Sequence, residues 1–508
     1  MPQPISRRQF LTLGAGLLAG LCGACLPAQA AGLASTPAPT GAAGQARPNI
    51  VYIVTDDLDA ASMEYMPLLK QHVAQRGLTF QNYLFNFALC CPSRTAVLTG
   101  MYAHHSGIYS NSSPDGGYAR IRELRLEEQM LPVWLRAAGY RTALIGKYVN
   151  GYPGGKQADP ALIPPGWSEW YSSPSGDPYS EYEYTLNENG TLVKYGSRPE
   201  DYGTDVYARK TLDFIQRSAR ERVPFFAYVA PYAPHSPFTP APRHAELFPG
   251  VQAPRTASFN EADVSGKPLA MQQAYPLLTT AKIAEIDRQY RLRLQSLQAV
   301  DELVADVVQQ LESLGILENT YLFFASDNGY HQGQHRMPSG KTMPYEEDIR
   351  VPLLVRGPGT AQGKTSQALV GNVDLAATLV ELAGAAPAAQ LDGRSLAGLF
   401  RGETPAGWRQ VYLLEHGAPQ AIPEQAQTAG KKKAAAWSQG LRSATHTYVE
   451  YPNGECELYD LRRDSDQLHN LASATPAAQI RQLSELTRRL RAAQGADLRA
   501  LEAQTLPI

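Results

Sequence analysis

Asn49-Ile50-Val51-Tyr52-Ile53-Val54-Thr55 is a short run of apolar and β-branched residues, and Asp56 and Asp57 follow it directly. Such a run is typical of a buried strand in a parallel sheet. In α/β folds, ligands collect beyond the carboxyl ends of the strands, where these two carboxylates stand. A pair of aspartates after a strand is more often a helix cap or a solvated turn. The pair therefore needs support from the rest of the chain.

Strand-like and helix-like segments alternate along most of the sequence. Short apolar runs predict strands, and apolar residues at three- and four-residue spacing predict helices. The predicted strands span residues 141–146, 224–230, 321–326 and 351–355, and the predicted helices span 127–138 and 282–314. This alternation predicts an α/β fold with a mostly parallel sheet flanked by helices.

The pattern changes after residue 401. Residues 418–436 are rich in Ala, Gln and Lys and are predicted to form a loop. Short strands over 448–451 and 457–461, followed by an amphipathic helix over 477–503, predict a small antiparallel sheet with a helix. A chain of 508 residues is long enough for a large domain and a smaller one. We expect a main domain over 48–401 and a C-terminal α+β subdomain over 402–508.

The overall composition excludes several classes of partner and scaffold. Lys and Arg number 46 and Asp and Glu 48, so a formal charge of −2 favours neither nucleic acid nor an anionic membrane surface. The chain has five cysteines, too few after the N-terminal segment for a disulfide-dependent secreted scaffold. The sequence leaves open whether Cys91 and Cys456 pair.

The N-terminal segment resembles an export signal. Ser6-Arg7-Arg8-Gln9-Phe10-Leu11 matches the twin-arginine pattern, and an apolar stretch over 11–21 follows it. Ala28-Gln29-Ala30 offers a small-residue cleavage site. We expect a twin-arginine signal peptide over 1–30, a disordered linker over 31–47, and export to the periplasm or beyond by the twin-arginine machinery.

One further stretch is the most specific in the chain, Cys90-Cys91-Pro92-Ser93-Arg94-Thr95-Ala96-Val97-Leu98-Thr99-Gly100. It resembles the signature of the type I sulfatases, Cys-x-Pro-Ser-Arg followed by Thr-Gly. The resemblance implies an alkaline-phosphatase-like fold, with the main domain as the catalytic domain. It also implies that a formylglycine-generating enzyme oxidises Cys90 to formylglycine. One hydroxyl of the aldehyde hydrate attacks a sulfate ester, and the other later expels the sulfate.

The same resemblance assigns a calcium site. Asp56, Asp57, Asp327 and Asn328 match the family's calcium ligands, and the formylglycine at position 90 completes the site. The chemistry agrees, because a hard dication with oxygen ligands can clamp sulfate oxygens. Ligand chemistry alone would also admit magnesium or manganese, so the choice of calcium rests on the resemblance.

The resemblance also assigns roles to Arg94, Lys147, His235 and Lys341, which join Cys90 as catalytic residues. Arg94 steadies the modified residue, and Lys147 binds sulfate. His235 and Lys341 bridge the ester oxygen, and they stabilise and protonate the departing alkoxide. Histidine suits this task because its side chain exchanges protons close to neutral pH.

The chain departs from the family pattern at one position. In Gly146-Lys147-Tyr148-Val149-Asn150 the histidine expected two residues after the lysine is Val149. That histidine normally orients a formylglycine hydroxyl. His104 and Asn150 are candidates to replace it, and His331 and His335 are further candidates for substrate-side residues.

Several loop segments resemble the branch of the family that contains N-acetylglucosamine-6-sulfatases. They are Gly146–Asn150, Pro165-Gly166-Trp167 with Trp170, Tyr184–Asn187, and Ser326–His331 with Gly333-Gln334. The branch predicts 6-O-desulfation of a glucosamine-type sugar in a sulfated carbohydrate. The alternatives are a broad arylsulfatase, a phosphonate or phosphodiester hydrolase of the same superfamily, and a catalytically silent protein that binds sulfated glycans. The last alternative is considered because Val149 stands where the family has a histidine.

Overall fold

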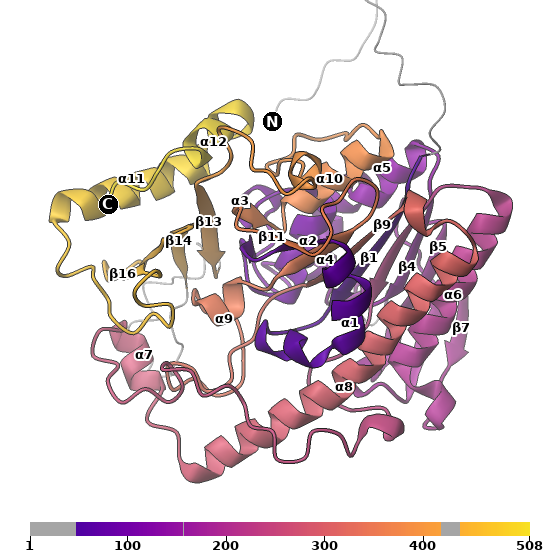
Figure 1. The fold of residues 1–508 in the computed structure, drawn as a ribbon, viewed down its shortest axis with the longest axis horizontal. Helices are drawn as coiled ribbons and strands as arrows, with labels where there is room; N and C mark the ends of the chain where they lie inside the picture. The colour runs from indigo at the N-terminus through magenta and orange to yellow at the C-terminus, as the bar shows by residue number, and fades with distance from the viewer. Residues whose placement is uncertain (1–46, 156, 418–436) are drawn as a thin grey trace, which may run out of the picture. The chain divides into compact units, whose positions relative to one another are not determined.

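The computed structural model describes residues 47–155, 157–417 and 437–508, and its centre is a sheet of ten strands (Figure 1). The order across the sheet is β11 (Lys364–Ser366), β2 (Leu78–Phe80), β10 (Leu353–Arg356), β9 (Thr320–Ser326), β1 (Asn49–Thr55), β8 (Phe225–Ala230), β4 (Arg141–Gly146), β5 (Glu169–Gly176), β6 (Tyr184–Glu188) and β7 (Thr191–Lys194). The expected α/β class is confirmed.

The middle of the sheet is parallel. β1 pairs with β9 along its whole length, from Asn49 opposite Thr320 to Thr55 opposite Ser326, and it pairs with β8 on its other side. β8 continues in parallel to β4, and β4 to β5. Every residue of β1 is buried, as its apolar sequence predicts. The carboxyl ends of β9, β1, β8 and β4 therefore meet at one edge of the sheet.

Helices flank this sheet in two groups. α6 packs on β8 and β4 and is itself covered by α8, whereas α5 packs on β4 and is joined by α2 and α10 (Figure 1). The helices of the structure are α1 (Pro67–His72), α2 (Cys90–Thr99), α3 (Ala103–Ser106), α4 (Gly117–Glu123), α5 (Leu131–Ala137), α6 (Gly203–Glu221), α7 (Leu269–Ala274), α8 (Thr280–Ser313), α9 (Glu346–Ile349), α10 (Asp374–Ala383), α11 (Ala477–Ala492) and α12 (Gly495–Glu502).

Two predicted elements of the main domain, one helix and one strand, differ from the structure. The helix expected over 127–138 begins only at Leu131, because Met130 is extended and Pro132 occupies the first turn, where its missing N–H does no harm. The strand expected over 351–355 is β10, and it runs antiparallel to β9 and to β2. The sheet is therefore mixed at its edges, where β6 and β7 are also antiparallel.

A separate antiparallel sheet follows, as expected. It contains β13 (Val411–His416), β14 (Ser438–Ser443), β15 (His446–Glu450) and β16 (Cys456–Asp460) in chain order. α11 packs against β13 and β14. The helix expected over 477–503 is divided into α11 and α12, because Ala493 and Gln494 are extended and Gly495 has a positive φ of 56°.

The described residues, from 47 onward, form one compact unit, and the expected boundary near residue 401 stays a prediction. The expected signal peptide, the linker up to residue 46 and the expected loop over 418–436 lie outside the described residues. Within the described ranges, the structure has no helix with both the length and the apolar character that a membrane crossing requires.

Candidate functional site

Acidic and amide side chains from two neighbouring strands meet at the carboxyl edge of the sheet. Asp56 and Asp57 follow β1, and Asp327 and Asn328 follow β9. The backbone N–H of Asp57 donates to Asp327 Oδ1 at 3.1 Å, and Asn328 Nδ2 donates to Asp57 Oδ1 at 2.8 Å. All four residues are buried. Uncompensated carboxylates at such depth would be unstable, so cations must lie nearby.

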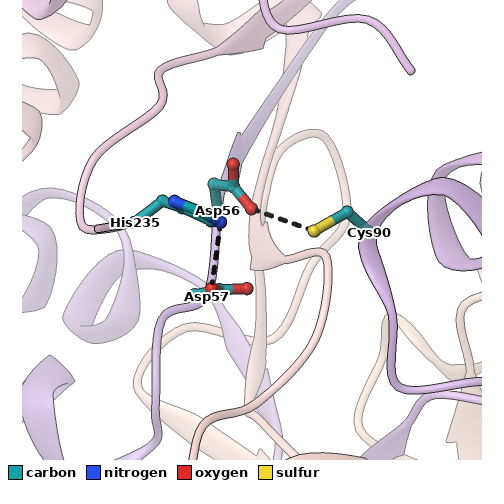
Figure 2. A group of neighbouring side chains, drawn as sticks. All are labelled: Asp56, Asp57, Cys90 and His235. Carbon is teal, nitrogen blue, oxygen red and sulfur yellow. Dashed lines mark hydrogen bonds and ion pairs between the residues drawn. The ribbon is translucent and has the colours of Figure 1, made fainter. Parts of the chain in front are cut away.

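Cys90 is the first residue of α2 and faces these carboxylates (Figure 2). Its Sγ atom is 3.4 Å from Asp56 Oδ1 and 2.6 Å from Lys341 Nζ. Burial and the nearby charge of Asp56 raise the pKa of the Cys90 thiol to about 12. The unmodified thiol is therefore uncharged near neutral pH, and in that form sulfur is a weak nucleophile.

Two lysines supply the compensating charge. Lys147 directly follows β4, and its Nζ is 2.5 Å from Asp56 Oδ2. Lys341, on the loop before α9, pairs with Asp57. Burial by itself would lower the pKa of both lysines, but Asp56 beside Lys147 and Asp57 beside Lys341 raise each pKa well above its ordinary value. Both ammonium groups thus stay protonated at this edge of the sheet.

Arg94 and His235 complete the group. Arg94, one helical turn after Cys90, donates from Nε to Asp327 Oδ2 at 2.8 Å and from Nη1 to the carbonyl of Lys147 at 2.9 Å. His235 lies on the loop after β8, with Nε2 3.6 Å from Asp57 Oδ2 (Figure 2). Its Nδ1 is 2.7 Å from the carbonyl of Ser236, which can only accept. Nδ1 must therefore carry the proton. The hydrogen bond from Nδ1 to Ser236 leaves Nε2 facing the carboxylates.

The carboxylate oxygens of this group are donors that a hard divalent cation prefers. Ligand atoms of Asp56, Asp57, Cys90 and His235 all lie within 4.8 Å of one another. Among the described residues, the buried Oδ1 atom of Asn328 has no hydrogen-bond partner. A carbonyl oxygen of this kind, set among carboxylates, is a ligand typical of calcium and magnesium sites.

The sequence did not identify Arg293 as part of this region. Arg293, on α8, donates from Nη2 to the carbonyl of Asp57 at 2.5 Å and to Asp59 Oδ2 at 2.9 Å. Its side chain is completely buried, with the guanidinium 4.1 Å from the ring centroid of Tyr330. A signal was available, because Arg293 interrupts an apolar stripe that includes Tyr290 and Leu297.

Two of the four predicted substrate-side residues lie beside the group. Asn150 and Lys147 both line an open cavity of about 210 Å³ next to β4 and β5. His331 pairs with Asp348 through Nδ1 at 2.9 Å, and its backbone bonds to Gly340, next to Lys341. Val149, at the position where the resemblance expects histidine, is buried in the hydrophobic core.

His104 and His335 are held elsewhere by other carboxylates. His104 Nδ1 lies 2.9 Å from Glu415 Oε2 on β13, and its ring stacks on Tyr102. His335 Nδ1 lies 2.8 Å from Glu261 Oε1. In the described ranges, no hydrogen bond or ion pair joins either histidine to the carboxylates at the sheet edge. The structure therefore does not place His104 where the missing histidine would act.

Comparison with known families gives two matches that together cover most of the chain. The sulfatase family model matches residues 48–385, and a model described as N-sulphoglucosamine sulphohydrolase, C-terminal, matches residues 333–495. The chain is 37% identical to human N-acetylglucosamine-6-sulfatase over 456 residues, which is 85% of this chain and 82% of that protein. It is 34% identical to an arylsulfatase of Volvox carteri, over 86% of this chain and 74% of that protein.

Solved structures agree on the architecture. BT4656 in complex with its substrate D-glucosamine-2-N,6-O-disulfate superposes with a TM-score of 0.73 at 25% identity, over 88% of this chain and 98% of that one. A phosphonate monoester hydrolase of Agrobacterium radiobacter superposes with a TM-score of 0.69 at 22% identity, over 88% and 96%. The second likeness concerns the fold alone.

Proposed function

Because this chain belongs to the sulfatase family and is a sulfuric ester hydrolase, we propose that it removes the 6-O-sulfate of an N-acetylglucosamine-type sugar. The observation that carries the proposal is the convergence of Lys147, Lys341 and His235 on one pair of strand-end carboxylates, with Cys90 between them. The choice of sugar is supported by the similarity to N-acetylglucosamine-6-sulfatase along most of both chains.

The residues at the sheet edge have the charges that sulfate transfer requires. The ammonium group of Lys147 lies beside Asp56, and that of Lys341 lies beside Asp57. Two fixed cations can hold the oxygens of a sulfate ester in one orientation and stabilise the negative charge that grows as the S–O bond breaks. Arg94 acts indirectly, because it ties Asp327 to the backbone of Lys147.

His235 is the side chain suited to protonate the departing alcohol. Its Nδ1 proton is donated to the Ser236 carbonyl, so Nε2 is the atom left to exchange a proton with the substrate. A sugar alkoxide is a poor leaving group, so its protonation in the transition state contributes roughly 10²–10⁴-fold to rate in enzymes of this kind.

We further propose that Cys90 carries formylglycine and that Asp56, Asp57, Asp327 and Asn328 hold one calcium ion. A formylglycine hydrate would supply one hydroxyl to attack sulfur and another to expel the sulfate. A calcium ion would neutralise charge on the sulfate oxygens. The unpartnered Oδ1 of Asn328 and the surrounding carboxylates support this ligand set. A formylglycine-generating enzyme is then required for maturation.

We also propose export by the twin-arginine route to the periplasm or the extracellular space. The support is the Arg7-Arg8 pattern and the similarity to a putative extracellular sulfatase of Caenorhabditis elegans, 38% identical over 73% of this chain. Replacing both arginines by lysine should keep the protein in the cytoplasm, which cell fractionation measures. Unchanged export would contradict this route.

The substrate proposal is tested with a panel of sulfate esters. The protein is produced together with a formylglycine-generating enzyme, and sulfate release is measured from the 6-O-, 4-O-, 3-O- and 2-O-sulfated sugars and from an aryl sulfate. We expect the 6-O-sulfate of N-acetylglucosamine to have the highest kcat/KM. Faster turnover of another sugar isomer would contradict the proposal, and turnover of the aryl ester alone would favour the arylsulfatase function that the Volvox relative suggests.

A further inference from the structure

Tyr179 lies between two residues that the proposed function employs, although no motif marks it. It belongs to a short 3-10 turn, η4 (Pro178–Ser180), in the connection between β5 and β6. Its ring centroid is 4.6 Å from that of His235. The ammonium of Lys147 is 5.2 Å from the same Tyr179 centroid. One aromatic ring thus contacts side chains that follow two different strands.

Among the described residues, the polar contacts of the His235 ring are to the adjacent Ser236 and to Asp57. Its hydrogen bond to the adjacent Ser236 carbonyl is local, and the 3.6 Å separation from Asp57 is longer than a hydrogen bond. The side chain is 23% exposed, so part of its ring is not packed against other residues. Packing against Tyr179 therefore limits the rotation that would turn Nε2 away from the sheet edge.

Lys147 is held on two sides. Its ammonium is hydrogen-bonded to Asp56 on one side and faces the Tyr179 ring on the other. An ammonium group is attracted to the face of an aromatic ring, and the attraction grows when both are shielded from water. Asn150 Nδ2 lies 3.4 Å from the Tyr179 hydroxyl, which ties the ring to the segment that follows Lys147.

The ring of Tyr179 also packs against a second tyrosine. It packs against Tyr232 with centroids 4.8 Å apart, and Tyr232 is buried. On its open side Tyr179 lines the same cavity as Lys147 and Asn150. Tyr179 is the residue of the β5–β6 connection whose ring meets the ammonium of Lys147.

We propose that Tyr179 is a positioning residue, which holds Lys147 and His235 in the relative arrangement that sulfate-ester hydrolysis requires. The inference rests on the proposed function, because both partners owe their roles to it. Tyr179 neither exchanges a proton with the substrate nor bonds to sulfur, and its effect is transmitted by ring packing. The ring, more than the hydroxyl, should therefore be the essential part.

The experiment compares Tyr179→Phe and Tyr179→Leu with Tyr182→Leu as a matched control. Tyr182 lies on the same connection but packs against Tyr202, at 5.6 Å between centroids. For each variant, kcat and KM are measured on N-acetylglucosamine 6-sulfate and on an aryl sulfate. The phenolate of the aryl sulfate is a good leaving group and departs without being protonated. Thermal unfolding is followed in parallel.

We expect Tyr179→Leu to lower kcat on the sugar ester by about tenfold to a hundredfold, because small misplacements of reacting groups have effects of that size. The loss on the aryl ester should be smaller, since protonation by His235 is not needed there. Tyr179→Phe and Tyr182→Leu should remain close to the unmodified protein in both kcat values.

Some outcomes would overturn the inference. Equal losses on the two esters by Tyr179→Leu would contradict the positioning of His235, and an equal loss by Tyr182→Leu would assign Tyr179 a purely structural role. Unchanged kcat values in Tyr179→Leu would exclude any role in positioning. A parent protein that carries formylglycine and hydrolyses none of the sulfate esters would contradict the proposed function and the inference together, so the two failures are distinguishable.

Discussion

At the scale of single residues, the site depends on groups whose charge is compensated only by one another. Asp56, Asp57 and Asp327 are buried, and their neighbours are Lys147, Lys341 and Arg94. Removing one member leaves its partner charged and unpaired at a buried position. Substitutions here must therefore be chosen so that a loss of activity can be separated from a loss of folding.

Cys90 and Cys91 are neighbours with different environments, and they give the first prediction. Cys90→Ala should abolish sulfate release, because Cys90 is the residue proposed to carry formylglycine. Cys91 is buried in the hydrophobic core, so Cys91→Ala should keep most of the activity and lower the free energy of unfolding by about 1 kcal/mol. Peptide mass spectrometry provides the check. An aldehyde found at position 91 would contradict the assignment.

Asn328 provides a test of the metal site that spares the buried ion pairs. Asn328→Ala removes the unpartnered Oδ1 but leaves Asp327 paired with Arg94. We expect calcium affinity to fall by about tenfold or more, measured by calorimetric titration of the purified protein. Asn319→Ala, at the residue just before β9, is the control and should bind calcium as the parent does. Equal affinity in all three proteins would remove Asn328 from the ligand set.

At the scale of elements, α9 connects the loop that carries Lys341 to the C-terminal sheet. Glu346, the first residue of α9, pairs with Arg442 of β14 and with Arg350 at the end of α9. Burial disfavours the charged carboxylate, but Arg442 and Arg350 hold the pKa of Glu346 at about 2, below its ordinary value of 4.5. The ion pair thus joins an element of the site to a strand from a different part of the chain.

This shift predicts a pH dependence of stability. Because the folded-state pKa of Glu346 is depressed, the carboxylate contributes its full stability above pH 4.5 and loses it as the pH falls toward 2. Glu346→Gln should lower the free energy of unfolding by about 3 kcal/mol at pH 7, and the difference should shrink below pH 4.5. Denaturant unfolding across this range measures it. Glu485→Gln, at an exposed pair on α11, should follow the parent at every pH.

The strands that could be predicted are those whose own sequence is enough to specify a strand. β1, β4, β8 and β9 are uninterrupted apolar runs, so their existence and the carboxylates at their ends follow from local sequence. β2 and β11 have only three residues each, too short for a periodic signal. The antiparallel direction of β10 depends on the strands with which it pairs, and the sequence of its four residues does not specify those partners.

The same distinction applies to the site. Four residues of the site directly follow strands or lie on the loops after them, so their convergence follows from the topology of a parallel sheet. They are Asp56, Lys147, His235 and Asp327. Tyr179 reaches the site only because β6 turns back beside β5, an arrangement that local patterns do not specify. His104 is adjacent to the cysteine motif in sequence, yet its pairing with Glu415 comes from the docking of a distant sheet.

At the scale of the whole molecule, α12 closes a buried network that reaches the centre of the protein. Glu502 is completely buried and accepts hydrogen bonds from Tyr102 and Arg394, and it pairs with Arg409 at 3.0 Å. Arg409 in turn makes a bidentate pair with Asp374 at the start of α10. One carboxylate near the end of the chain therefore joins α12 to residues from three earlier segments.

This network predicts that a substitution outside the site affects stability without affecting chemistry. Glu502→Ala leaves Arg409 buried with one carboxylate in place of two, and we expect the free energy of unfolding to fall by about 3–5 kcal/mol. The folded fraction should retain its kcat, because Glu502 contacts none of the residues assigned to the reaction. Chemical unfolding and kinetics on the same sample measure both effects. A normal unfolding midpoint would show that the network is dispensable.

The burial of Cys90 has a consequence for how much active protein a cell obtains. The folded chain encloses the Cys90 side chain, and its contact with Lys341 joins residues 251 positions apart. Contacts between such distant positions raise the contact order and slow folding, which lengthens the time during which Cys90 is accessible. Under the proposed maturation, folding and oxidation are competing reactions, and every chain that folds first is trapped as an inert product. Specific activity per milligram would then report the ratio of two rate constants, so conditions that accelerate folding should lower it.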